Sequence, residues 1–367
     1  MRIAILTLPL CVNFGNVLQC YALQRVLGRM GHDVSVLEQR VPFVSRTRLF
    51  FTRLIKTYIL RKESRYYGAK TENEIVGRNF QTFRRKYMCV CHFSSWTSIH
   101  EHSFDAIVVG SDQVWRKDYN DRIQHMYLDF AKDWKRLKRV AYAASFGTDN
   151  LGYSPDEISE CSDLLKLFDA VSMREVSGVE LCKRDFGVDA VCCIDPTLLL
   201  TAGDYLDLLE GWKIPKHPNG LLCYFIDSSD EKEQLAEQVS VKKGLDVFKV
   251  NNPDVWMWNK TFEERAQLPI EYWIAGFRDA DFVVTDSFHG CVFSILFNKP
   301  FIVIGNVERG MARFNSLLSI FHLENRLALM GGNHAICDEP IQWDEVNKIL
   351  KDKRQESLSF LSAYLGD

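Results

Sequence analysis

The chain has 367 residues, more than one ordinary hydrophobic core accommodates, and this length predicts two domains. Charged residues make up 25% of the sequence and hydrophobic residues 47%, a balance that excludes a disordered chain. The formal net charge is −3, with positive charge concentrated in one segment, and we expect no nucleic-acid partner.

The eleven cysteines indicate the compartment. Their number is odd and their spacing shows no pattern of paired bridges, so we expect reduced thiols. Met1 leads directly into a strand-like run without a cleavage site, and no apolar stretch reaches the roughly 18 residues that span a bilayer. We therefore expect a cytoplasmic protein without a signal peptide.

The first forty residues predict a β-α-β unit. RIAILTL at 2–8 is a strand-like apolar run, and 9–16 is a loop. The helix expected at 17–31 has apolar positions every three or four residues and ends at Gly31. DVSVLEQ at 33–39 is the second strand.

Residues 42–86 form a basic stretch. They hold twelve Lys or Arg against three Glu, a local charge of +9, interleaved with apolar and aromatic side chains. A basic amphipathic stretch can lie on an anionic membrane surface or bind polyanions. The alternative is an inserted helix that packs its apolar side on its own domain and keeps its charges in water.

Apolar runs of strand length then alternate with helix-like stretches in two blocks. The first block has expected strands at 104–110, 139–147, 168–174 and 188–195. After a Gly- and Pro-rich break at 201–220, the second block has expected strands at 221–227, 245–250, 281–286 and 300–305, and helices at 230–243, 289–297 and 311–321. The last stretch, 344–364, predicts a helix that crosses back to the first domain.

This alternation predicts an α/β fold with parallel sheets that are covered on both faces. We place the first domain at 1–200, including the basic insertion, and the second at 201–367. Ligands of such sheets bind outside the carboxyl ends of the strands, where helix N-termini point at the bound group. The residues that follow each strand are therefore candidate site residues.

Polar residues follow two strands of the first domain. In NFGN, Asn16 can cap the next helix and Gly15 lets a ligand approach the backbone closely. In GSDQVW, Asp112 either caps the next element or acts on a hydroxyl as a general base. Arg174 ends a further apolar strand, which is costly unless an anion meets the guanidinium. The alternative there is an internal salt bridge with Glu175.

TDSFHG, at 285–290, joins a strand to a helix. Its acid, serine and histidine resemble part of a hydrolase triad with Ser287 as the nucleophile, but the helix N-terminus favours an anion site instead. Ser287 then becomes an anion contact or a cap, and Asp286 either caps the helix or orients the His289 imidazole.

Arg309 and Arg313 lie four residues apart on one predicted helical face, within reach of an anion beside His289. Together with Arg174, they indicate a small, doubly charged anionic substrate. CVCH at 89–92 is the only dense Cys/His cluster and lacks a second pair at zinc spacing, so we expect no metal site.

Seven motifs occur in the order in which they occur in the polysaccharide pyruvyl transferase family, which the chain resembles from residue 13 to about 327. They are NFGNVLQCYALQ, VVGSDQVW, YAASFG, SMREVSG, DPTLLL, TDSFHGCVFSILFNKPFIVI and RGMARFNSLLSIFHLENRL. The resemblance implies a fold like that of GT-B glycosyltransferases, with two Rossmann-like domains facing a cleft. It also implies phosphoenolpyruvate as co-substrate and no cofactor.

The implied reaction transfers pyruvate to sugar hydroxyls, usually as a ketal, on an exopolysaccharide, capsule or cell-wall glycan or its lipid-linked precursor. His289 is then the candidate for proton donation, and Asp112 for the base on the acceptor hydroxyl. Expected donor contacts in the second domain and at the end of one first-domain strand are Arg174, Ser287, His289, Arg309 and Arg313. Expected acceptor contacts in the first domain are Asn13, Gly15, Asn16, Gln19, Ser111 and Asp112.

A lipid-linked acceptor would bring the protein to the inner membrane face through 42–86. Two other functions stay open. One is a GT-B glycosyltransferase that uses a nucleotide sugar, and the other is a non-catalytic glycan-binding subunit.

Overall fold

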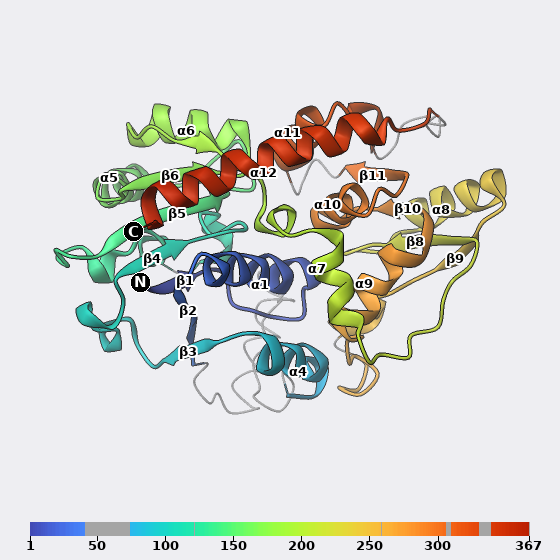
Figure 1. Cartoon of the computed structure of the whole chain (residues 1–367), viewed down its shortest axis with the longest axis horizontal. Coiled ribbons are helices and arrows are strands. Elements are labelled where there is room, and N and C mark those ends of the chain that lie inside the picture. Colours follow the sequence, from blue (N-terminus) through green and yellow to red (C-terminus); the bar gives the residue numbers. More distant parts are fainter. Residues whose placement is uncertain (41–73, 121, 258, 306–309, 330–338, 367) are drawn as a thin grey trace.

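The computed structural model describes residues 1–40, 74–120, 122–257, 259–305, 310–329 and 339–366. Within these ranges, the strands form a seven-stranded sheet of order β3-β2-β1-β4-β5-β6-β7 and a five-stranded sheet of order β12-β11-β10-β8-β9. All strand pairs are parallel. The two sheets and their helices lie side by side (Figure 1). The predicted α/β class is confirmed.

The strands of the first sheet are β1 (Arg2–Leu6), β2 (Asp33–Gln39), β3 (Val90–Phe93), β4 (Ala106–Val109), β5 (Lys138–Ala144), β6 (Ala170–Met173) and β7 (Val191–Cys192). Those of the second are β8 (Gly220–Tyr224), β9 (Asp246–Phe248), β10 (Ala280–Thr285), β11 (Phe301–Gly305) and β12 (Leu327–Leu329). The helices are α1 (Phe14–Arg29), α4 (Arg78–Tyr87), α5 (Pro155–Leu165), α6 (Val176–Phe186), α7 (Ala202–Leu206), α8 (Asp230–Lys243), α9 (Ile270–Asp279), α10 (Phe288–Leu296), α11 (Ala312–Ile320) and α12 (Trp343–Leu365).

Helix α1 begins three residues earlier than the sequence predicts. The Asn13 side chain accepts a hydrogen bond from the Asn16 backbone N–H at 3.1 Å and is therefore the N-cap. The expectation that Asn16 caps this helix is wrong. The shift places Gly15 and Asn16 in the first turn, where the free backbone N–H groups of the helix lie.

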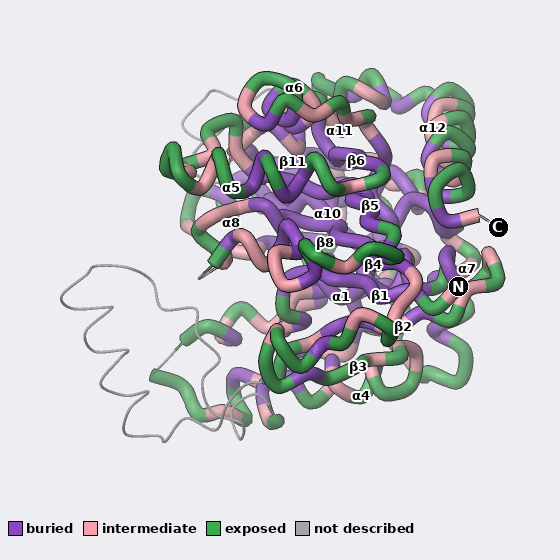
Figure 2. The backbone as a smooth tube through the Cα atoms, turned by 90° about the vertical axis from the view of Figure 1, so that its left-hand side faces the viewer, coloured by how far each residue is buried: buried purple, intermediate pink, exposed green. Residues whose placement is uncertain are grey.

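The strands run through the buried interior, whereas α5, α8 and α12 each keep an exposed face (Figure 2). Every residue of β4 and of β8 is buried, as the continuous apolar runs predict for a sheet covered on both faces. The core also joins the two halves of the chain. Phe14 of α1 stacks on Trp273 of α9, with 5.5 Å between ring centroids and 11° between ring planes.

Helix α12 follows the second sheet in sequence but contacts the first half of the chain. Arg354 donates from Nε to the Leu198 carbonyl at 2.7 Å, and the Ser357 hydroxyl accepts from the Ile194 N–H at 3.2 Å. The helix thus holds the segment that follows β7.

Most of the basic stretch, residues 42–73, lies outside the described residues. Its described end forms α4, which buries Phe80 and Phe83 and keeps its basic residues at the surface or in ion pairs, such as Arg84 with Glu38. The Phe83 ring lies 5.5 Å from that of Tyr21 on α1. This part of the stretch is therefore an inserted helix that packs its apolar side on its own domain.

Candidate functional site

Several candidate residues lie where the two sheets reverse their strand order. The order changes direction between β1 and β4 in the first sheet and between β8 and β10 in the second. Ligands of doubly wound sheets bind outside the carboxyl ends of the strands at such positions. Asn13 and Gly15 follow β1, Asp112 follows β4, and His289 follows β10.

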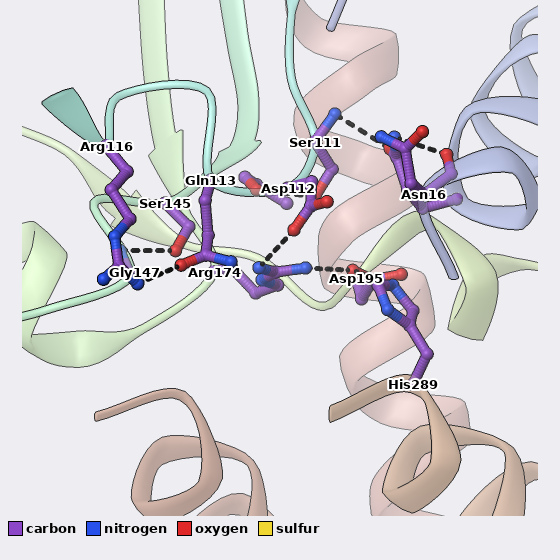
Figure 3. A network of polar contacts seen from close by, with 12 residues as sticks. Asn16, Ser111, Asp112, Gln113, Arg116, Ser145, Gly147, Arg174, Asp195 and His289 are labelled. Carbon is purple, nitrogen blue, oxygen red and sulfur yellow. Dashed lines mark hydrogen bonds and ion pairs between the residues drawn. The ribbon is translucent and has the colours of Figure 1, made fainter. Parts of the chain in front are cut away.

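Arg174 lies at the centre of the polar network shown in Figure 3. Its Nη1 donates to Asp195 Oδ2 at 2.8 Å and its Nη2 to Asp112 Oδ1 at 3.1 Å. The guanidinium also lies 4.4 Å from the centroid of the Phe288 ring. The sequence predicted Glu175 as the alternative partner, but the ion pairs of Arg174 are with Asp112 and Asp195.

Asp112 is a buried carboxylate on a strained loop, with a backbone φ of 72°. Burial alone raises the pKa of this carboxyl, but the positive charges of Arg174, His289 and Arg313 outweigh that effect and hold the pKa below its ordinary value. Asp112 is therefore an ionised acceptor at neutral pH.

Two of the expected acceptor contacts support the Asp112 loop from behind. Gln19 is fully buried; its Oε1 accepts from the Ser111 N–H at 3.1 Å, and its Nε2 donates to Thr7 Oγ1 at 3.1 Å. The Ser111 hydroxyl donates to the Ala143 carbonyl at 2.7 Å. In this structure, both side chains fix the backbone next to Asp112.

Asn16 differs from these two residues. It is 4% exposed, and its Oδ1 is buried without a hydrogen-bond partner within the described part of the chain. Figure 3 places it beside Ser111, on the side of the network opposite Arg116. Unlike Gln19, Asn16 thus has an acceptor atom that no group in the described part of the chain uses.

His289 reaches the network from the other half of the chain. Its Nε2 lies 3.5 Å from Asp195 Oδ2 and makes no hydrogen bond to any described residue. Its Nδ1 side lies against Gly15, where a Cβ would come within 2.0 Å of Nδ1. Gly15 therefore contributes the space that the imidazole occupies.

Asp195 is the residue on which Arg174 and His289 converge. Burial opposes its ionisation, but the charges of His289 and Arg174 and the hydrogen bond from Thr197 lower its pKa far below the usual range for an aspartate. The carboxylate is completely buried, and its Oδ1 accepts from the Thr197 hydroxyl at 2.7 Å.

The structure assigns the two polar neighbours of His289 to structural contacts. Ser287 is the N-cap of α10, and its hydroxyl accepts from the Gly290 N–H at 3.3 Å. Asp286 accepts from Lys232 Nζ at 2.6 Å and from the Ile226 N–H at 2.7 Å. Asp286 therefore neither caps the helix nor orients the imidazole, because its oxygens face Lys232 and the end of β8.

Arg313 approaches the network from the first turn of α11. Its guanidinium lies 5.8 Å from the Phe288 ring, and no described carboxylate lies within ion-pair distance. Burial and the neighbouring charge of Arg174 lower its pKa to about 10, so it is charged at neutral pH. Arg309, the other arginine expected here, lies outside the described residues.

Glu175 is a third buried carboxyl near the arginines. Its Oε1 accepts from the Ser145 hydroxyl at 2.7 Å and from the Phe146 N–H at 3.2 Å, while its Oε2 is buried without a partner in the described structure. Burial raises the pKa of this carboxyl. Asp112 and Glu175 are thus shifted in opposite directions within one site.

Among the described residues, no group of three or more His, Cys, Asp or Glu side chains could hold a metal ion. The ten cysteines in these ranges are free thiols. No described helix is long and apolar enough to cross a membrane.

A model of the polysaccharide pyruvyl transferase family matches residues 13–308 of the chain. The chain belongs to this family. The matched region contains Asp112, Arg174, Asp195 and His289 and ends before α11. No curated protein matches the chain.

Solved structures show that this family member has a GT-B-like fold. UDP-GlcNAc 2-epimerase from Neisseria meningitidis, bound to UDP-GlcNAc, is 9% identical, and the match covers 100% of this chain and 99% of the epimerase with a TM-score of 0.50. UGT89C1 from Arabidopsis thaliana, complexed with UDP-L-rhamnose, is 10% identical over 100% and 99% of the two chains, with a TM-score of 0.51. At such low identity the likeness is one of fold alone.

In this pyruvyl transferase family member, Asp195 is a strand-end candidate for which the sequence predicted no role. It follows β7, so its position at a strand end was visible in the sequence, as was that of Thr197. What the sequence did not show is that Asp195 pairs with a histidine 94 positions later in the chain.

Proposed function

We propose that the chain transfers the pyruvyl group of phosphoenolpyruvate to two hydroxyls of a sugar and forms a ketal. The acceptor would be a bacterial-type exopolysaccharide, capsule or cell-wall glycan or its lipid-linked precursor. One observation carries the proposal. His289 and Arg313 from the second half approach Asp112 and Arg174 from the first, and Arg313 has no described carboxylate within ion-pair distance.

The charges at this site suit the donor. Phosphoenolpyruvate carries a carboxylate and a phosphate, and anions of this kind are bound by arginines. Arg174 is already neutralised by Asp112 and Asp195, which leaves Arg313 as the described cation best able to bind the donor. Arg309 and the N–H groups at the start of α10 are further proposed donor contacts.

The proposed reaction begins with a proton transfer from His289 to the methylene carbon of the donor. The C=C electron pair forms the new C–H bond, and C2 becomes cationic. A sugar hydroxyl attacks C2 and gives its proton to Asp112. The C2–O bond to phosphate then breaks, a second hydroxyl closes the ketal, and its proton leaves with the phosphate. The residues need to supply only acid, base and charge, so we propose no cofactor and no metal.

Ligand binding and phosphate release test this function. Phosphoenolpyruvate should raise the Tm of the full chain, and phosphate should be released when sugars with neighbouring hydroxyl pairs are added. His289→Gln should abolish release, whereas His322→Gln, at a histidine outside the network, should not. Stabilisation by UDP-sugars but not by phosphoenolpyruvate would instead identify a nucleotide-sugar transferase. A glycan phenotype that persists with His289→Gln would identify a non-catalytic subunit.

We also propose a cytoplasmic location, with contact to the inner membrane face through residues 42–86. The reason is the local charge of +9 in the sequence of this stretch. Two of its arginines, Arg78 and Arg84 on α4, form ion pairs within the protein. Co-sedimentation with vesicles should increase with the fraction of anionic lipid. Sedimentation that is independent of this fraction would refute the membrane contact.

A further inference from the structure

The Asp195 carboxylate lies within ion-pair distance of two basic side chains, Arg174 and His289, from different halves of the chain. Its Oδ2 lies 2.8 Å from Arg174 Nη1 and 3.5 Å from His289 Nε2. Its Oδ1 is occupied by the Thr197 N–H at 3.0 Å and the Thr197 hydroxyl at 2.7 Å. One oxygen is therefore fixed by its own loop, and the other is left for the two charged side chains.

The loop that carries Asp195 is held independently of His289. The N–H of Ile194 donates to the Ser357 hydroxyl on α12, and Arg354 on the same helix donates to the Leu198 and Leu200 carbonyls. A carboxylate that is held in this way can orient a side chain from another element by a direct contact.

We propose that Asp195 is a positioning residue, which keeps the His289 imidazole protonated and oriented for the proton transfer. This inference rests on the proposed function, in which His289 is the proton donor. Asp195 itself stays ionised throughout. The proton that leaves His289 goes to the donor carbon, and the ring recovers a proton from solvent after the product has left.

The surrounding charges single out Asp195 for this role. Asp112 and Asp195 are the carboxylates whose charges interact with His289, and Arg174 and Arg313 are the cations of the same network. Of the described carboxylates, only Asp195 forms an ion pair with the imidazole.

Other neighbours do not provide this charge. Asp286, three residues before His289, is directed at Lys232, and the facing turn of α1 presents Gly15 and Asn16, which carry no charge. The lowered pKa of Asp195 agrees with the proposed role.

The test compares the pH dependence of kcat for three proteins. In the wild type, activity should fall at high pH as the proton donor is lost. Asp195→Asn keeps the shape of the side chain but removes its charge, and should move this alkaline limb to lower pH by about one unit. Thr197→Val keeps the Asp195 charge and removes only the hydroxyl that holds Oδ1. It should lower kcat without moving the limb.

The outcomes separate the role from simple structural damage. If both variants lose rate and neither shifts the limb, Asp195 is only a structural group and the proposal is wrong. If Asp195→Asn fails to fold, Gly15→Ala provides the second test, because it displaces the His289 ring and leaves Asp195 paired with Arg174. The alkaline limb of its kcat profile should also move to lower pH. If the wild type transfers no pyruvate at all, the proposed function fails. A wild type that is active, with an unchanged limb in the variants, refutes only the role of Asp195.

Discussion

Gly15 of α1 and His289 of α10 fit together across the two halves of the chain. A Cβ on Gly15 would lie 2.0 Å from His289 Nδ1 and 2.8 Å from its Cβ, distances that no side chain tolerates. The contact includes the base of the histidine side chain, so a rotation of the ring alone does not relieve it. Only glycine at position 15 is compatible with the observed position of His289.

Gly15→Ala should therefore reduce pyruvyl transfer by about 100-fold, because a displacement of about 1 Å at a reacting group has an effect of this size. Gly28→Ala in the same helix is the control, since nothing lies within 4 Å of its missing Cβ. It should keep full activity and stabilise the protein by about 0.5–1 kcal/mol. Equal activity of the two variants in a phosphate-release assay would show that the His289 position is unimportant.

Arg313→Gln should weaken donor binding more than it slows the chemical step. The guanidinium has no described carboxylate within ion-pair distance, so its charge is available to an anion. We expect KM for phosphoenolpyruvate to rise about tenfold or more, which is about 1.4 kcal/mol of binding free energy, with a smaller change in kcat. Arg184→Gln, at an exposed arginine that pairs with its neighbour Asp185, should leave both constants unchanged. A drop in kcat at constant KM would assign Arg313 to the transition state instead.

Lys232→Met should destabilise the protein by about 3–5 kcal/mol, because it leaves the buried Asp286 carboxylate without its counterion. The chain offers a control with the same geometry. Lys183 and Asp189 also lie 2.6 Å apart, but with side-chain exposures of 67% and 88% instead of 6% and 3%. Lys183→Met should change the unfolding free energy in urea by no more than about 1 kcal/mol. Similar losses for both variants would mean that burial does not determine the strength of the Lys232 pair.

Periodicity and strand length were sufficient to predict most of the fold. The ranges 33–39 and 230–243 coincide with β2 and α8, where a regular apolar pattern is bounded by clear stop signals. Strand β3 was missed because it has four residues at the sheet edge and two of them are exposed, so its sequence lacks an apolar run. Strand β12, with three residues, is too short to be distinguished from a loop.

The site was predictable only in part. The strand-end rule identified Asp112, Arg174 and His289, because it needs nothing but strand positions. The predicted partners of Arg174 and His289 were wrong. Glu175 and Asp286 were chosen because they lie next to Arg174 and near His289 in the sequence. Both carboxylates have other partners, and Asp195 takes their place through packing between the halves of the chain.

Ser287→Ala should separate the helix-cap role from that of a nucleophile. The hydroxyl accepts from the Gly290 N–H, so its loss should lower the unfolding free energy by about 1 kcal/mol. Pyruvyl transfer should persist, because the backbone N–H groups of α10 and the His289 ring remain in place. Ser287→Thr, which retains a capping oxygen, should recover most of the stability. Complete loss of turnover in a folded Ser287→Ala variant would restore the serine as a reacting group.

The unfolding free energy of Glu175→Gln, relative to that of the wild type, should increase as the pH rises. Burial raises the pKa of Glu175 in the folded protein, so folding favours the protonated form. The stability that this group contributes is fully present below its unfolded pKa of about 4.3 and is lost as the pH rises through the folded pKa. Glutamine keeps the acceptor oxygen for Ser145 and carries no charge to bury.

Asp112 and Asp195 change the unfolding free energy with pH in the opposite direction, because their pKa values are lowered in the folded protein. These two contributions are the same in the wild type and in Glu175→Gln, so they cancel when the two unfolding free energies are subtracted. Urea denaturation of both proteins at a series of pH values from about 4 to about 8 therefore isolates Glu175. A difference in unfolding free energy that is constant, or that decreases toward high pH, would mean that Glu175 is ionised in the folded protein. Its Oε2 would then need a counterion, for which the charges of Arg174 and Arg313 are the candidates in the described structure.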